Sequence, residues 1–178
     1  MTALARPKKS GLSYFPLDVD FFEDPKIKIL RARYGRDGIM FYIYLLCEIY
    51  KQGYYVQVDD DFEYIISDDL KMDQNKAKQV LNFLLSRSLF DNTLFQSDKV
   101  LTSAGIQRRF QLAVKERARK NPIEGGRFWL LKKEDTEPFI KCTLFEGSSG
   151  KTDSFSGNNG GNSPEESLKK SKVNKSIY

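Results

Sequence analysis

Apolar positions recur with the period of an α-helix between residues 74 and 87, at the i, i+3, i+4, i+7, i+8 spacing of one helix face. The residues of this face are Ala77, Val80, Leu81, Leu84 and Leu85. The opposite face carries amides, a hydroxyl and one cation, and consists of Asn75, Lys78, Gln79, Asn82 and Ser86. Asp73 is positioned to cap the first turn. The pattern predicts a capped helix with a buried seam on one side and a carboxylate-free polar surface on the other.

Two further helices are predicted nearer the N-terminus. Asp24 followed by Pro25 is a helix start, and Gly35 is its expected end, with Ile27, Leu30 and Tyr34 facing inward. The next helix runs from about residue 37 to a residue before 53. Its segment IMFYIYLLCEIY is apolar nearly all round, which is typical of the most buried helix of a domain.

A short β-rich stretch at residues 54–58 leads into a predicted helix over 59–70, with Phe62, Ile65 and Ile66 inward. The acids of this helix are Asp59, Asp60, Asp61, Glu63, Asp68 and Asp69. Several lie in the first turn, where the helix dipole stabilises negative charge. A capped, solvated face is the favoured interpretation, and a metal or nuclease site is the alternative. We expect this acidic surface to point away from bound DNA.

After the 74–87 helix, residues 89–90 and 100–101 are short apolar pieces separated by a polar loop at 91–99. They predict a two-stranded wing, in which Lys99 is the only cation. Thr102 or Ser103 caps a last helix ending near residue 120, with Ile106, Phe110 and either Ala113 or Val114 as its packing stripe. The fold class is therefore mainly α (α+β), a winged helix-turn-helix with an N-terminal extension and a C-terminal helix.

The chain divides by composition into four parts. Residues 1–13 form a flexible basic arm, for which solvation and phosphate contact are both open interpretations, and residues 14–120 form the winged-helix domain. At 121–146 the β-prone segments RFWLL and PFIKCTL favour a small β-hairpin or a pair of strands. Residues 147–178 are rich in Gly, Ser, Asn and Lys, which predicts a disordered linker.

Composition narrows the chemistry. The chain has no histidine and only Cys47 and Cys142, so a disulfide framework, a histidine metal site and a histidine-based catalytic pair are not expected. We interpret Cys47 as a small buried hydrophobe rather than a reactive thiol. No phosphate-binding glycine loop or nucleophile elbow is present, so we predict neither an enzyme nor a cofactor. No apolar run is long enough to cross a membrane, and a cytoplasmic protein of a bacterial cell is expected.

The polar face of the 74–87 helix predicts contact with DNA. Its amides and hydroxyl, on Asn75, Gln79, Asn82 and Ser86, are suited to base edges in a major groove. Phosphates are assigned to Lys71, Lys78, Arg108 and Arg109, and Lys99 in the wing is the remaining predicted DNA contact. The last helix carries six cations against Glu116, although these cations alternatively serve only to keep the helix solvated.

An interaction module is the second hypothesis. Tyr14, Phe15, Phe21 and Phe22 are numerous for a terminal segment, and an exposed aromatic cluster often marks an interface. The domain would then oligomerise and scaffold an assembly without reading DNA sequence. Asp18 and Asp20 in the same segment are a metal-site alternative, but an extended segment docked on the core is favoured.

Three motifs together resemble a known family. YFPLDVDFFED (14–24), EIYKQGYY (48–55) and LTSAGIQRRF (101–110) look like the N-terminal domain of phage-type replisome organisers, which are similar to the primosomal protein DnaD. The resemblance covers roughly residues 6–120. It implies a winged helix, binding of origin or single-stranded DNA, self-association, and recruitment of replicative helicase or its loader. In that family the linker leads to a second helical domain, and the genes belong to phages or integrated elements.

Overall fold

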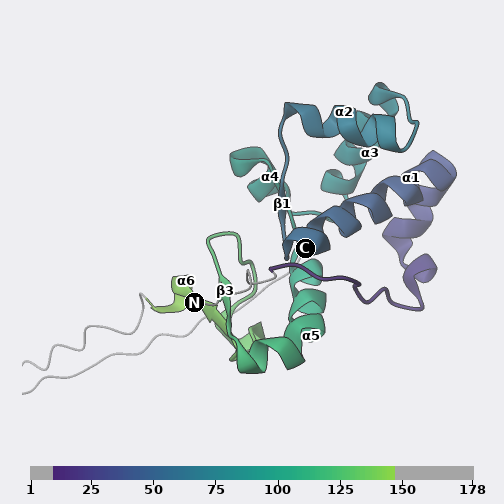
Figure 1. The fold of residues 1–178 in the computed structure, drawn as a ribbon. Helices are drawn as coiled ribbons and strands as arrows, with labels where there is room; N and C mark the ends of the chain where they lie inside the picture. Colours follow the sequence, from purple (N-terminus) through teal and green to yellow (C-terminus); the bar gives the residue numbers. More distant parts are fainter. Residues whose placement is uncertain (1–9, 147–178) are drawn as a thin grey trace, which may run out of the picture.

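A computed structural model describes residues 10–146 and shows a helix-rich α+β fold, as predicted (Figure 1). Its elements in chain order are η1 (Phe21–Glu23), α1 (Pro25–Gln52), β1 (Val56–Gln57), α2 (Asp60–Asp69), α3 (Gln74–Ser86), α4 (Asn92–Asp98), β2 (Val100–Leu101), α5 (Ala104–Lys120), β3 (Ile123–Gly125), η2 (Lys133–Asp135), β4 (Ile140–Cys142) and α6 (Thr143–Glu146). The predicted linker at 147–178 and most of the basic arm lie outside the described residues.

Helix α1 is two helices in one continuous run. Gly35 interrupts it with φ 64° and ψ −148°, a conformation that glycine adopts without a steric penalty, at the position where the sequence predicted a break. Asp24 caps the start, accepting hydrogen bonds from the backbone N–H groups of Lys26 and Ile27. The second half of α1, predicted to be apolar nearly all round, is buried along the face that meets the core. Cys47, however, is exposed, because it lies on the solvent side of this helix, so its interpretation as a buried residue was wrong.

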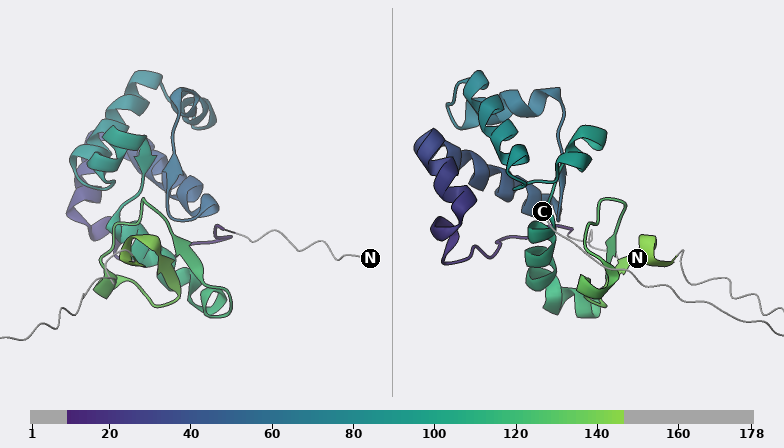
Figure 2. Two further views of the ribbon diagram at one scale, coloured as in Figure 1. Left: turned by 90° about the vertical axis from the view of Figure 1, so that its left-hand side faces the viewer. Right: turned by 180° about the vertical axis from the view of Figure 1, so that it is seen from behind.

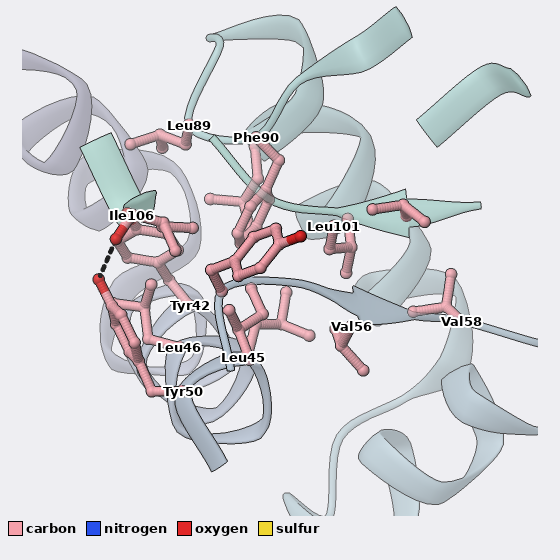
Figure 3. Packing of buried hydrophobic residues seen from close by; sticks show 14 of the residues in the cluster. Tyr42, Leu45, Leu46, Tyr50, Val56, Val58, Leu89, Phe90, Leu101 and Ile106 are labelled. Atoms are coloured by element: carbon pink, nitrogen blue, oxygen red, sulfur yellow. Dashed lines mark hydrogen bonds between the residues drawn. The ribbon is translucent and has the colours of Figure 1, made fainter. Parts of the chain in front are cut away.

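The core joins α1 to the small sheet (Figure 3). Strands β1 and β2 pair antiparallel, with Val56 opposite Leu101, and both side chains are buried against residues of α1. The Tyr50 hydroxyl donates a hydrogen bond of 3.2 Å to the backbone carbonyl of Ile106. This buried contact fixes the end of α1 against the start of α5.

The predicted wing hairpin does not form in the described residues. Leu89 and Phe90 are buried in irregular backbone, and β2 pairs with β1 instead of with them. The loop expected at 91–99 contains α4, because Asp91 caps a helix by accepting from the Leu94 N–H at 2.8 Å. Leu94 and Phe95 then pack on the core. Asp91 and Asn92, which are typical turn residues, therefore begin a helix in this chain.

One packing expectation is corrected, and one open alternative is resolved. Ile65 is exposed on α2, where Ile66 and Ser67 take the buried positions. On α5, capped by Ser103, Val114 is buried and Ala113 is exposed. The buried stripe of α2 is therefore rotated slightly from the position inferred from hydrophobicity, whereas the stripe of α5 runs through Ile106, Phe110 and Val114 as expected.

The C-terminal extension is a pair of strands but not a hairpin. Strands β3 and β4 pair in parallel, with Ile123 opposite Ile140, and the segment RFWLL forms the loop between them. Phe128, Trp129 and Leu131 of that loop are buried, so its apolar residues serve packing rather than strand pairing. No helix within residues 10–146 has both the length and the apolar character of a membrane span.

Candidate nucleic-acid interface

Helix α3 holds its polar face outward as predicted. Asp73 caps the helix, accepting from the Lys76 N–H at 3.1 Å. The five seam residues are all buried, and Phe83 is buried beside them. The side chains of Asn75, Lys78, Gln79, Asn82 and Ser86 are all exposed. The helix packs on α1 and α2 through its seam, which leaves amide and hydroxyl groups facing solvent along one surface.

Two cations assigned to phosphate contacts are paired with acids of α2. The Lys78 Nζ lies 3.7 Å from Glu63 Oε2, and Lys71 Nζ lies 2.8 Å from Asp68 Oδ1. The hydrogen bond to Asp68 and its charge raise the pKa of Lys71 above its ordinary value. Glu63 therefore approaches the polar face, because α2 packs directly on α3. The expectation that the α2 acids point away from bound DNA stays a prediction.

The structure does not place Arg108 and Arg109 beside α3. Both are on α5, which starts beside the end of α1 and lies below α3 in every view (Figures 1 and 2). Arg109 is half-buried and forms an ion pair with Asp18. It closes a pocket of about 20 Å³ against Tyr42 and Tyr50, which has room for roughly one water molecule. A pocket of this size does not accommodate a cofactor.

Lys99, the cation predicted for the wing, ends α4 in a left-handed conformation. Its ammonium lies 5.0 Å from the ring centroid of Phe95, so part of its role is packing against its own helix. Since the wing is absent, Lys99 is not on the element to which we assigned it.

Sequence reasoning missed the cations that do lie beside α3. The guanidinium carbons of Arg33 and Arg87 are 5.7 and 5.6 Å from the ring centroid of Phe83. Arg87 directly follows the helix and could have been found from its position. Arg33 comes from the first half of α1, and nothing in the local sequence pattern indicates that it meets α3.

The aromatic segment divides into packed and exposed residues. The ring of Phe15 stacks on Tyr50 with centroids 4.7 Å apart, and Phe21 stacks on Tyr42 at 6.2 Å. Tyr14 is 85% exposed and Phe22 is 49% exposed. Phe15 and Phe21 therefore contribute to this chain's own core, and Tyr14 and Phe22 face solvent.

Several of the acids considered for metal binding have other partners. Asp59 caps α2, Asp69 accepts a hydrogen bond from the Tyr44 hydroxyl, and Asp18 pairs with Arg109. Within residues 10–146, no group of three or more His, Cys, Asp or Glu side chains is arranged to hold a metal ion. The favoured interpretation of the α2 acids as a capped and solvated face agrees with these contacts.

Comparisons with known proteins match the part of the chain that contains α3. The sequence model of the Lin1244/Lin1753-like N-terminal family matches residues 14–106. A protein of Listeria innocua serovar 6a, described as uncharacterized phage-related protein Lin1244/Lin1753, is 36% identical over 117 residues. The aligned region covers 66% of this chain but only 38% of that protein. No solved structure matches the chain.

Proposed function

We propose the function of this chain from one premise: it belongs to the Lin1244/Lin1753-like N-terminal family. The chain is a DNA-binding domain of phage or mobile-element origin that acts in the initiation of replication. Its phage origin is supported by the phage-related relative. The replication role is supported by the resemblance of its three motifs to replisome organisers. In this proposal α3 enters a major groove of DNA.

The exposed polar face of α3 carries the proposal. Asn and Gln side chains form bidentate hydrogen bonds with adenine edges, and serine hydroxyls bond to several bases. Gln79, Asn82 and Ser86 are exposed along one side of a helix whose other side is anchored in the core. A helix held in this way presents its side chains to a groove without losing packing, since none of them is needed by the seam.

Substitution of the amides tests this proposal. The variant Gln79→Ala with Asn82→Ala should lose preference for a duplex sequence selected from a random pool, by about 10- to 100-fold. The measurement is fluorescence anisotropy on the selected and a scrambled duplex at fixed salt. A matched control is Asn92→Ala with Gln96→Ala, which removes an exposed amide pair from α4. If both double variants bind the selected duplex alike, α3 does not read DNA.

The protein partners of the proposed domain follow from the same resemblance. A replicative helicase or its loader is the expected partner, and the domain itself acts without a cofactor and without enzymatic activity. The aligned region covers 38% of the related phage protein. We therefore propose these partners for an assembly in which this domain takes part. Co-purification with the helicase or loader encoded beside its gene is the corresponding measurement.

Self-association through the aromatic segment is the second proposed function. The exposed side chains of Tyr14 and Phe22, with Leu17 and Val19 between them, favour it. Sedimentation velocity at several concentrations should show a larger species for the natural chain than for Tyr14→Ser with Phe22→Ser. Tyr64→Ser removes an exposed aromatic from α2 and is the control. Equal sedimentation of all three proteins would refute this second function.

A further inference from the structure

A basic cluster lies at the C-terminal end of α3. It consists of Lys26 and Arg33 from α1 and of Arg87, which follows α3. The Lys26 ammonium donates a hydrogen bond of 3.3 Å to the backbone carbonyl of Ser88. In the part of the chain that the structure describes, none of these three cations forms an ion pair, whereas Lys71 and Lys78 both do. The uncompensated positive charge beside α3 is therefore at its C-terminal end.

The ring of Phe83 positions the two guanidinium groups. Phe83 is 5% exposed, and the ring of Tyr34 meets it edge-on with centroids 5.6 Å apart. The Tyr34 hydroxyl in turn donates to the backbone carbonyl of Gln79 at 3.4 Å. Attraction between a cation and an aromatic ring offsets the repulsion between two nearby guanidinium groups. A buried ring therefore keeps two arginines together on the surface.

Arginine held against a ring is suited to binding phosphate. A guanidinium that stacks through its flat face keeps its N–H donors free at its edge, in a fork that matches two phosphate oxygens. Because the side chains are already placed, little conformational entropy is lost when an anion binds. A lysine at either position would keep the charge but would not provide the fork.

We propose that Arg33 and Arg87, held by Phe83, form a clamp for a DNA backbone phosphate beside the polar face of α3. This inference rests on the proposed function and specifies how the DNA backbone is held. Asn82 directly precedes Phe83 on α3, and Ser86 lies three residues after it. A groove that admits their side chains therefore brings its phosphates to the two arginines.

The location also satisfies an electrostatic requirement. The C-terminal end of a helix carries partial negative charge, which repels phosphate. The cluster of Lys26, Arg33 and Arg87 neutralises that end. The neighbouring exposed groups are uncharged amides and a hydroxyl, which match the base edges next to a phosphate better than they match an acidic protein surface.

Charge-removing variants test the clamp. Arg33→Gln and Arg87→Gln should each weaken duplex binding roughly five- to tenfold, equally for unrelated sequences, and lower the salt slope by about one. Arg33→Lys should weaken binding without changing that slope, because the charge remains. Arg119→Gln is the control, since it removes an exposed arginine, paired with Glu116, at the far end of α5. Thermal unfolding of each variant confirms that the fold is retained.

The outcomes separate the clamp from the proposed function. If the arginine variants bind DNA like Arg119→Gln while the α3 amide variant loses sequence preference, the clamp is wrong and DNA reading stands. If the natural chain binds no DNA, both are wrong. If the arginine variants weaken binding of polyglutamate as strongly as binding of DNA, the cluster is a general anion surface and the clamp is overturned.

Discussion

Arg117 donates a hydrogen bond of 2.9 Å from its Nη1 to the backbone carbonyl of Gly11. Its Nη2 donates to the carbonyl of Ser10 at 3.2 Å, and the Leu12 N–H donates to the carbonyl of Tyr50 at 2.7 Å. The start of the described chain is thus held between the end of α1 and the last turn of α5. Arg117, one of the six cations of α5, therefore anchors the N-terminal segment, a role that composition did not indicate.

Gly11→Ala should displace this segment. A Cβ at Gly11 would lie 1.8 Å from the backbone oxygen of Lys51, which cannot move without disturbing the end of α1. We expect a loss of about 1–3 kcal/mol in the free energy of unfolding, measured by urea denaturation. The control is Gly105→Ala in the first turn of α5, where the added Cβ meets nothing closer than 3.5 Å. An unchanged stability for Gly11→Ala would contradict the close approach.

Buried glutamines attach the C-terminal extension to α5. Gln107 is fully buried, its Nε2 donates to the Phe128 carbonyl at 2.8 Å, and its Oε1 accepts from the Leu130 N–H at 2.7 Å. Gln111 Nε2 likewise donates to the Asp135 carbonyl, and its Oε1 accepts from the Glu137 N–H. The polar side chains of this helix therefore replace the partners that a strand would provide for the irregular backbone of the extension.

Gln107→Leu should release the loop that contains Trp129. Removing the amide leaves a carbonyl and an N–H of the extension without partners, at a cost of about 2 kcal/mol or more. Fluorescence of Trp129, the only tryptophan, reports the change directly during urea denaturation. Gln96→Leu makes the same substitution at an exposed position of α4 and should change stability by less than about 0.5 kcal/mol. Equal effects for the two variants would contradict the role of Gln107.

The thiols should differ in reactivity. Cys47 is exposed on α1 and Cys142 is buried in β4, so only Cys47 should react with a thiol reagent before unfolding. Partial burial and the charge of Glu48 raise the pKa of Cys47, so its reaction should be slower than that of free cysteine at neutral pH. Glu48→Gln should speed it up modestly, because it lowers that pKa. Rapid reaction of both thiols in the folded protein would contradict the burial of Cys142.

Local sequence signals predicted the helices well. The seam of α3, the caps at Asp24 and Asp73, and the break at Gly35 each depend on residues within one or two turns. The wing was not predictable in the same way, because Asp91 is equally suited to a turn and to a helix cap. The partner of β2 is β1, which lies before three intervening helices, and hydrophobic pattern does not specify such non-local pairing.

The candidate site was predicted only in its local part. The polar face of α3 follows from helical period, and the Asp68–Lys71 ion pair joins residues only three positions apart in the sequence. Three other contacts join residues that are far apart in the sequence. They are the ion pairs Glu63–Lys78 and Asp18–Arg109 and the contact of the Arg33 guanidinium with the ring of Phe83. Which cations remain free to meet a phosphate is decided by those tertiary contacts, and sequence alone does not provide them.

The last prediction concerns pH. The Tyr44 hydroxyl of α1 donates to the carboxylate of Asp69 on α2, and this hydrogen bond, with partial burial, raises the pKa of Tyr44 from 10.0 to about 12. Because the folded-state pKa is raised, the contribution to stability is present in full below pH 10 and is lost as the pH rises through about 12. The pair is largely exposed, so its contribution is at most about 1 kcal/mol.

Comparison of the natural chain with Tyr44→Phe measures this contribution. Urea denaturation should give a constant difference in unfolding free energy between about pH 7 and 9, and the difference should shrink toward zero above pH 10, as the phenol ionises. Tyr64→Phe is the control, because Tyr64 is exposed on α2 and its hydroxyl has no hydrogen-bond partner within residues 10–146. A difference that persists unchanged at about pH 12 would show that Tyr44 stabilises α2 through its ring rather than through Asp69.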